Sequence, residues 1–206
     1  MAAICAFLMA PTARASEPLK IVALGDSLTA GYGLPGDEAF PARLQKALRA
    51  KGYDVKIVNA GVSGDTTTAG LDRLAWSVPK DTDGVILELG ANDALRGVDP
   101  KVTKATLEKI LDRLDKCHIP VLLAGMESPR NMGPDYVKAF DAIYPALAAH
   151  YDVVFYPFFL AGVAADPKSN QADGMHPNPQ GVDIIVQRML PSVEQLIARA
   201  KKARQS

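Results

Sequence analysis

The stretch LKIVALGDSL, residues 19–28, decides the fold, because an apolar run there ends directly at a small polar turn. Similar apolar runs recur along the chain, at residues 55–59, 85–89, 121–124 and 153–156. Each run is short and rich in Val, Ile or Leu, as strands buried on both faces of a parallel sheet are. The runs therefore predict five parallel strands.

Between these runs lie longer segments with helical patterns, at residues 40–51, 67–77, 101–117, 135–150 and 179–202. Regular alternation of strand and helix predicts an α/β fold, a doubly wound five-stranded parallel sheet with helices on both faces. Such sheets bind ligands beyond the carboxyl ends of their strands. We therefore expect the chemistry in the segments that directly follow the apolar runs.

The composition fits one soluble α/β domain, which we expect to span residues 16–206. Lys and Arg together number 23, as do Asp and Glu, so the formal net charge is zero. This balance gives no electrostatic reason to expect nucleic acid or an anionic membrane surface as a partner. The oligomeric state cannot be read from these features.

The N-terminus differs from the rest of the chain. Residues 2–10 are apolar, and Ala13-Arg14-Ala15 then forms an A-x-A pattern. This arrangement predicts a signal peptide over residues 1–15 and export to the periplasm or the medium, and the alternative is an uncleaved N-terminal arm. The apolar stretch is too short to span a bilayer. After cleavage only Cys117 remains, so we expect no internal disulfide, and no residues have zinc-ligand spacing.

Ser27 follows the first apolar run within Gly25-Asp26-Ser27-Leu28. At a strand-to-helix turn a serine hydroxyl can project from the sheet edge, and unpaired backbone N–H groups there can bind an oxyanion. The alternative is that Asp26 and Ser27 only cap a helix. For Asp26 we favour a role in bracing the serine over a capping role alone.

The next two polar segments offer hydrogen-bond donors. Gly64, in the segment that follows residues 55–59, could present its N–H to an oxyanion, and Asp65 or Thr66 could cap the next helix. Asn92, after residues 85–89, could donate from its side chain into the same hole. Taken alone, Asn92 and Asp93 could simply form a turn.

His176 lies in a loop with Asp173 three residues before it. That spacing lets a carboxylate reach Nδ1 while Nε2 faces outward, as a general base requires. Pro177 favours an extended backbone at His176, and Asn178 and Pro179 are typical of the first residues of a helix. The alternative for the segment is a plain turn before a helix.

Together, GDSL at 25–28, GVSGD at 61–65, GAND at 90–93 and DGMH at 173–176 resemble the four signature blocks of the SGNH (GDSL) hydrolase superfamily. GYGL at 31–34 and LELGANDALRG at 87–97 resemble its bacterial arylesterase, acyl-CoA thioesterase and lysophospholipase branch. The resemblance implies a flavodoxin-like three-layer α/β/α fold and a serine esterase or thioesterase without metal or cofactor. It also implies the triad Ser27, Asp173 and His176, and an oxyanion hole made by Ser27, Gly64 and Asn92.

The substrate implied is a small acyl ester or thioester, with a carbohydrate O-deacetylase as the alternative on the same blocks. Apolar residues at 157–160 and Met132 could receive an acyl chain or could seal the core. Loops at 96–99, 128–135 and 158–171 would border the site.

The competing non-enzyme class is a flavodoxin-like binding module, although no phosphate-cradling loop follows the first strand. Residues 31–36 also spell G-x-G-x-x-G, the pattern of a dinucleotide site. The motif lies six residues beyond the strand and contains Pro35, so its context does not match a dinucleotide site. We interpret this segment as a loop that flanks the active site.

Overall fold

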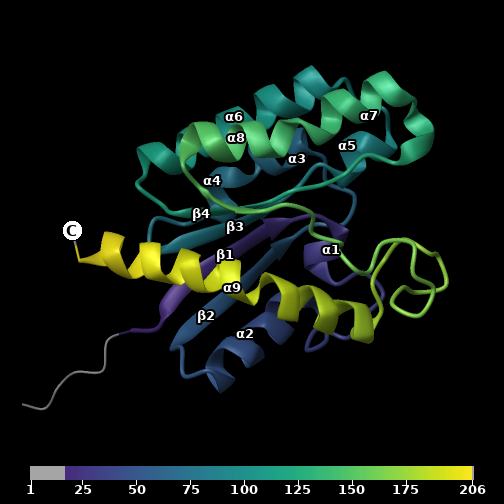
Figure 1. Cartoon of the computed structure of the whole chain (residues 1–206). Coiled ribbons are helices and arrows are strands. Elements are labelled where there is room, and N and C mark those ends of the chain that lie inside the picture. The colour runs from purple at the N-terminus through teal and green to yellow at the C-terminus, as the bar shows by residue number, and fades with distance from the viewer. Residues whose placement is uncertain (1–16, 206) are drawn as a thin grey trace, which may run out of the picture.

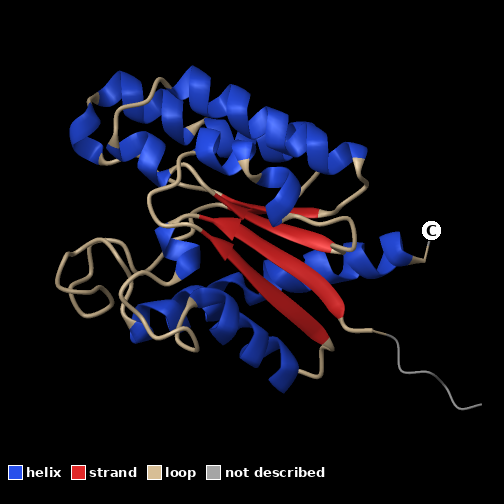
Figure 2. Cartoon of the chain, turned by 180° about the vertical axis from the view of Figure 1, so that it is seen from behind, coloured by secondary structure: helices blue, strands red, loops and turns tan. Residues whose placement is uncertain are grey.

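The structure is a computed structural model that describes residues 17–205. The expected signal peptide at residues 1–15 lies outside the described residues. Five parallel strands form one sheet in the order β2-β1-β3-β4-β5 (Figures 1 and 2). Their bounds are β1 Leu19–Gly25, β2 Val55–Gly61, β3 Gly84–Glu88, β4 Val121–Ala124 and β5 Val154–Tyr156.

Helices cover both faces of the sheet, so the predicted three-layer α/β/α fold is confirmed. Helices α2 (Phe40–Ala50) and α9 (Pro179–Arg204) pack together on one face (Figure 1). The other face carries α3 (Thr67–Asp72), α4 (Leu74–Ser77), α6 (Pro100–Lys116), α7 (Pro134–Asp141) and α8 (Ile143–Tyr151). Three short segments at the carboxyl side of the strands complete the fold, α1 (Ser27–Ala30), α5 (Ala91–Leu95) and the 3₁₀ turn η1 (Arg130–Met132).

The central strands are apolar because the helical layers bury both of their faces. All five residues of β3 and all four of β4 are buried. Burying one Val, Leu or Ile side chain contributes about 1.5–3 kcal/mol relative to exposure. The largest buried side chains fill the space between sheet and helices, among them Phe40, Phe140, Tyr144 and Phe159.

The register brings the functional segments to one edge. Gly25 at the end of β1 pairs with Gly61 of β2 and with Glu88 of β3, so these three strands end level with one another. The strand order also reverses direction between β1 and β3, which is the switch point where such sheets bind ligands. The segments after β1, β2 and β3 therefore leave the sheet side by side.

Two predicted helices are each divided in the structure. The helix expected over residues 67–77 breaks at Arg73, where the backbone leaves helical geometry (φ −96°, ψ 2°) and the side chain is buried. The helix expected over 135–150 breaks at Ala142. Pro145 explains this second break, because it has no N–H to donate to Asp141 and its ring crowds that carbonyl.

The ends of the remaining helices follow local sequence. Asn178 caps α9, accepting a hydrogen bond from the Gly181 N–H at 3.0 Å, and Pro179 takes the first helical position, as predicted. Thr66 caps α3 and Asp99 caps α6. Cys117 is exposed at the end of α6. In the described range, no helix is both long enough and apolar enough to cross a membrane.

Candidate active site

Ser27 is the first residue of α1, directly beyond the end of β1. Asp26 caps this short helix, because its Oδ1 accepts a hydrogen bond from the Leu28 N–H at 3.0 Å. Within residues 17–205 the Ser27 N–H has no hydrogen-bond acceptor. The turn thus presents both a hydroxyl and an N–H at the edge of the sheet.

His176 reaches Ser27 from a loop 149 residues further along the chain. Its Nε2 lies 3.0 Å from the Ser27 Oγ, and its Nδ1 lies 2.6 Å from the Asp173 Oδ2. The other carboxylate oxygen of Asp173 accepts hydrogen bonds from the backbone N–H groups of Met175 (2.9 Å) and His176 (3.0 Å). These backbone hydrogen bonds and the contact with the imidazole lower the pKa of Asp173 from 3.8 to about 2.

The loop after α1 packs against this histidine. The Tyr32 ring lies over the imidazole, with 4.6 Å between ring centroids. The Gln171 side chain donates to the Tyr32 carbonyl (2.7 Å) and to the Pro177 carbonyl (3.0 Å), which joins the two loops. A Cβ at Gly33, where φ is +74°, would lie 2.2 Å from the Gln171 Oε1, so the junction needs glycine there. The G-x-G-x-x-G stretch therefore flanks the histidine in space.

Gly64 and Asn92 occupy the two neighbouring segments. Gly64 has a positive φ of 88°, and its N–H has no acceptor in the part of the chain that the structure describes. The Arg96 side chain donates to the Gly64 carbonyl at 2.8 Å. The Asn92 Nδ2 donates to the Asp65 carbonyl (3.0 Å) and to the Asp26 Oδ2 (3.1 Å). Asn92 thereby contacts both of the other segments.

Two buried carboxyl groups lie beneath the serine turn. Asp26 is fully buried, and burial raises its pKa from 3.8 to about 6 although Leu28 and Asn92 both donate to it. Glu88, at the end of β3, is also fully buried, and its pKa is raised well above 4.5 by burial and by the nearby charge of Asp26. The Glu88 Oε2 accepts from the Thr29 hydroxyl (2.7 Å) and from the Asp26 N–H (3.3 Å).

Asp93 braces the site from behind. It is buried, and its carboxylate accepts hydrogen bonds from the Thr67 N–H (2.8 Å) and hydroxyl (2.6 Å) at the start of α3. The Thr103 hydroxyl of α6 adds a longer bond at 3.3 Å. Asp93 therefore holds α5 against helices α3 and α6.

A pocket of 520 Å³ opens beside Ser27, Asn92 and His176. Its walls are mostly apolar and include Leu28, Leu95, Met126, Phe158, Leu160 and Met175. Of the stretch 157–160, Phe158 and Leu160 line this pocket, whereas Phe159 is buried in the core against Phe40. Met132 does not line it. The apolar stretch thus serves both of the roles that the sequence left open.

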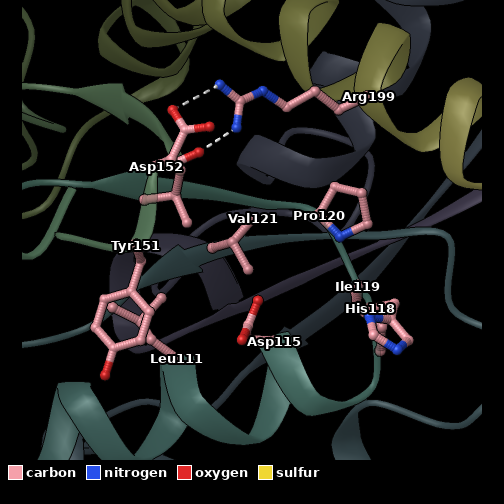
Figure 3. Close-up of a pocket in the computed structure, with 10 residues that line it drawn as sticks. Leu111, Asp115, His118, Ile119, Pro120, Val121, Tyr151, Asp152 and Arg199 are labelled. Atoms are coloured by element: carbon pink, nitrogen blue, oxygen red, sulfur yellow. Dashed lines mark hydrogen bonds and ion pairs between the residues drawn. The ribbon is translucent and has the colours of Figure 1, made fainter. Parts of the chain in front are cut away.

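A second hollow, of 310 Å³, lies at the opposite end of the strands (Figure 3). His118 lies in its wall, and Arg199 pairs there with Asp152. The residues that line the hollow include no Ser, Thr or Cys, so its walls offer no serine, threonine or cysteine nucleophile. Across residues 17–205, no three His, Cys, Asp or Glu side chains gather in a way that could hold a metal ion.

Several residues around the site were not singled out from the sequence. Glu88 had a visible signal, since it is an acid inside an otherwise apolar strand. Arg73 gave no local signal, because only the structure shows that its helical neighbours Gly70 and Ser77 are buried. Tyr32 and Gln171 lie in segments that were expected beside the site, but no local pattern predicted their contact, which joins loops 139 residues apart.

The chain resembles characterised and solved proteins over most of its length. It is 41% identical over 175 residues to an arylesterase of Vibrio mimicus, covering 84% of this chain and 86% of that one. It is 39% identical over 192 residues to thioesterase 1/protease 1/lysophospholipase L1 of Escherichia coli (strain K12), covering 93% and 91%. The crystal structure of TesA superposes with a TM-score of 0.81 at 37% identity, covering 86% of this chain and 99% of that one.

The sequence profile of the GDSL-like Lipase/Acylhydrolase family matches residues 23–184, which contain every polar segment described above. The match spans most of the chain, and the relatives carry esterase and thioesterase names. The chain belongs to the GDSL-like lipase/acylhydrolase family and is an ester-hydrolysing enzyme.

Proposed function

We propose that Ser27 is the nucleophile of a serine esterase and thioesterase, with His176 as its general base and Asp173 as the acid that orients the histidine. The observation that carries this proposal is the chain of contacts from Ser27 Oγ to His176 Nε2 (3.0 Å) and from His176 Nδ1 to Asp173 (2.6 Å). A serine hydroxyl is a poor nucleophile near neutral pH and needs an adjacent base to take its proton. The contacts supply that base in an orientation fixed by a carboxylate.

In the first step, Ser27 Oγ attacks the carbonyl carbon of the ester or thioester while His176 takes the hydroxyl proton. The tetrahedral intermediate collapses, and the alcohol or thiol leaves with the proton that His176 returns. In the second step, water attacks the acyl-enzyme by the same route, which releases the carboxylic acid and restores Ser27. Asp173 stays ionised throughout, because its pKa of about 2 lies far below neutral pH.

The oxyanion of each intermediate would be met by the N–H groups of Ser27 and Gly64 and by the side chain of Asn92. In the free enzyme both hydrogens of the Asn92 amide already have acceptors, the Asp65 carbonyl and the Asp26 carboxylate. We propose that the hydrogen directed at Asp26 turns to the oxyanion, while the Asp65 carbonyl holds the other. Donors of this kind contribute most when they are fixed before charge develops.

Ser27→Ala tests the proposal. The variant should fold as the parent does but lose hydrolysis of p-nitrophenyl butyrate, and an alkyl phosphonate should label the parent only at Ser27. Ser192→Ala, on α9 and away from the site, should keep parental activity. Parental turnover by Ser27→Ala would refute the nucleophile.

The pocket beside Ser27 indicates acyl esters as the substrate class. Its apolar walls would receive an acyl chain, and the relatives are named arylesterase and thioesterase/lysophospholipase. We expect kcat/KM to rise with acyl length until the pocket is filled. A series of p-nitrophenyl esters, acyl-CoA thioesters and lysophosphatidylcholines would rank the natural substrates. A flat profile across chain lengths would argue against an acyl pocket.

We further propose that residues 1–15 direct export, and that residues 16–206 act as one hydrolase domain in the periplasm or the medium. The support is the apolar stretch followed by the A-x-A pattern. N-terminal sequencing of the protein from a periplasmic fraction should begin at Ser16. An intact N-terminus on cytoplasmic protein would refute the proposal.

A further inference from the structure

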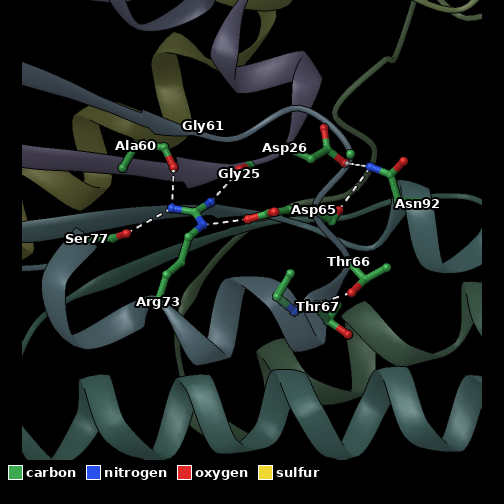
Figure 4. A network of polar contacts seen from close by, with 12 residues as sticks. Gly25, Asp26, Ala60, Gly61, Asp65, Thr66, Thr67, Arg73, Ser77 and Asn92 are labelled. Carbon is green, nitrogen blue, oxygen red and sulfur yellow. Dashed lines mark hydrogen bonds and ion pairs between the residues drawn. The ribbon is translucent and has the colours of Figure 1, made fainter.

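Arg73 is a buried cation that the catalytic proposal does not use. It lies at the break between α3 and α4, and only 7% of its surface is exposed. Figure 4 shows its guanidinium beneath the ends of β1 and β2, with Gly25, Ala60, Asp65 and Ser77 around it. Burying a guanidinium costs desolvation free energy unless its N–H groups are hydrogen-bonded and its charge is paired. The partners of Arg73 therefore indicate which segments it holds together.

The guanidinium makes four hydrogen bonds to three separate segments. It donates to the Gly25 carbonyl (2.8 Å), the Ala60 carbonyl (2.8 Å), the Ser77 hydroxyl (2.9 Å) and the Asp65 carboxylate (2.5 Å). The Asp65 carboxylate is itself largely buried, so water screens this ion pair little. One side chain therefore joins the ends of two strands to the loop that follows the second strand.

Two of these four contacts lie beside a proposed oxyanion donor. Gly25 immediately precedes the Asp26-Ser27 turn, and Asp65 immediately follows Gly64. The Asp65 carbonyl is also the acceptor that holds the Asn92 amide at 3.0 Å (Figure 4). The path from Arg73 through Asp65 thus reaches Gly64 along the backbone and Asn92 by a hydrogen bond.

We propose that Arg73 is the positioning residue of the oxyanion hole, and that it holds the Ser27, Gly64 and Asn92 donors at fixed separations. The inference rests on the proposed function, because it takes these three groups as the donors. Arg73 itself does not line the substrate pocket, so it acts through the segments that it joins. A misplacement of about 1 Å at a catalytic group can cost about 10²-fold in rate.

Arg73→Lys is the variant that tests this role. Lysine keeps the positive charge but has a single nitrogen in place of the planar fork, so it cannot reach acceptors that lie against three different guanidinium nitrogens. With p-nitrophenyl butyrate, kcat should fall about 10- to 100-fold while KM changes less than about threefold, because the acyl pocket is untouched. The matched control is Arg204→Lys. Arg204 pairs with Asp83 at the other end of the sheet, at 2.7 and 2.9 Å, and its variant should keep the parental kcat.

A double-mutant cycle separates positioning from a purely structural role. If Arg73 acts through the donors, Arg73→Lys should cost much less in an Asn92→Ala background, since one donor that it positions is already gone. If Arg73 only stabilises the fold, its kcat factor should be the same in both backgrounds. An equal factor, or a drop in melting temperature with kcat within about twofold of the parent, would overturn the inference.

The same experiment keeps the two proposals apart. Parental kcat in Asn92→Ala alone would refute the oxyanion hole itself, whereas an impaired Asn92→Ala beside a fully active Arg73→Lys would refute only the role of Arg73. If Arg73→Lys does not fold, Asp65→Asn weakens the same link while it keeps the Asp65 carbonyl. That variant should show a smaller kcat loss with the same non-additivity, and strict additivity with Asn92→Ala would again overturn the inference.

Discussion

Replacing Asp26 by Asn should stabilise the enzyme at neutral pH although it alters a residue next to the nucleophile. The Asp26 carboxyl is fully buried, and burial raises its pKa from 3.8 to about 6. The neighbouring carboxyl of Glu88 is also fully buried, and burial together with the charge of Asp26 raises its pKa well above 4.5. At pH 7 the protein therefore carries an ionised carboxylate in a site that favours the neutral form.

The magnitude follows from this pKa. Because the folded state binds the Asp26 proton more tightly than the unfolded chain does, the free energy of unfolding falls as pH rises from about 4 to about 6, then levels off. A change from 3.8 to about 6 corresponds to about 3 kcal/mol at 25 °C. Asn still caps α1 but cannot accept the bond from Asn92, which costs about 1 kcal/mol. Asp26→Asn should thus be about 2 kcal/mol more stable than the parent at pH 7 and about 1 kcal/mol less stable at pH 4.

Urea unfolding followed by circular dichroism at pH 4, 5, 6 and 7 measures this difference directly. Asp81→Asn is the matched control, because its exposed carboxylate bonds to Lys20 and its pKa is lowered. A carboxylate whose pKa is lowered in the folded protein stabilises the fold at pH values above its pKa in the unfolded chain. Asp81→Asn should therefore be slightly less stable than the parent toward pH 7 and equally stable in acid. A pH-independent difference for Asp26→Asn, or a loss of stability at pH 7, would contradict the reasoning.

Three further predictions follow from single contacts. Asp173→Asn should lower kcat by up to about 10⁴-fold, because an amide no longer fixes the imidazole tautomer; steady-state kinetics would check this, and a kcat near the parental value would contradict it. Phe159→Ala should lower the free energy of unfolding, measured in urea, by about 3–5 kcal/mol, because the Phe159 ring is fully buried in the core. Phe158→Ala should chiefly raise KM for long acyl chains, because Phe158 lines the pocket. Equal losses of stability in the two variants would contradict this assignment. Gly25→Ala should lower both the melting temperature and kcat, because a Cβ there would lie 2.1 Å from the Thr29 hydroxyl oxygen, and parental values of both would argue against this contact.

The fold could be predicted from local patterns. Five short runs rich in Val, Ile or Leu are typical of strands in a sheet covered by helices, so they predicted the strands and the three layers that the structure has. The edge strand β2 is the least buried of them, with Lys56 and Asn59 exposed. The caps at Thr66 and Asn178 were likewise readable, because capping depends on residues only two or three positions apart. The two helix breaks were not predicted. The first lies at Arg73, whose side chain is buried, and the second lies at Ala142, three residues before a proline.

The segments of the site were named from the sequence because each follows a strand, and parallel strands end at one edge of the sheet. The hydrogen-bond partners of the residues in these segments were not predicted. For Asp26 the sequence favoured a role in bracing Ser27 over capping alone. In the structure one carboxylate oxygen caps the turn and the other accepts a hydrogen bond from Asn92. The pocket walls were also left open, and only the packed chain separates Phe158 from Phe159.

The sequence by itself determined the order of strands and helices and the residue types at each turn, since these depend on hydrophobic spacing and local backbone preference. Tertiary structure alone decided that Arg73 joins three segments, that Glu88 lies buried under the serine turn, and that Gln171 ties the Tyr32 loop to the histidine loop. The physical reason is that a buried polar group must find its hydrogen-bond partners in the packed protein. The most distant of those partners lie 48, 59 and 139 residues away in the sequence, where no local pattern records them.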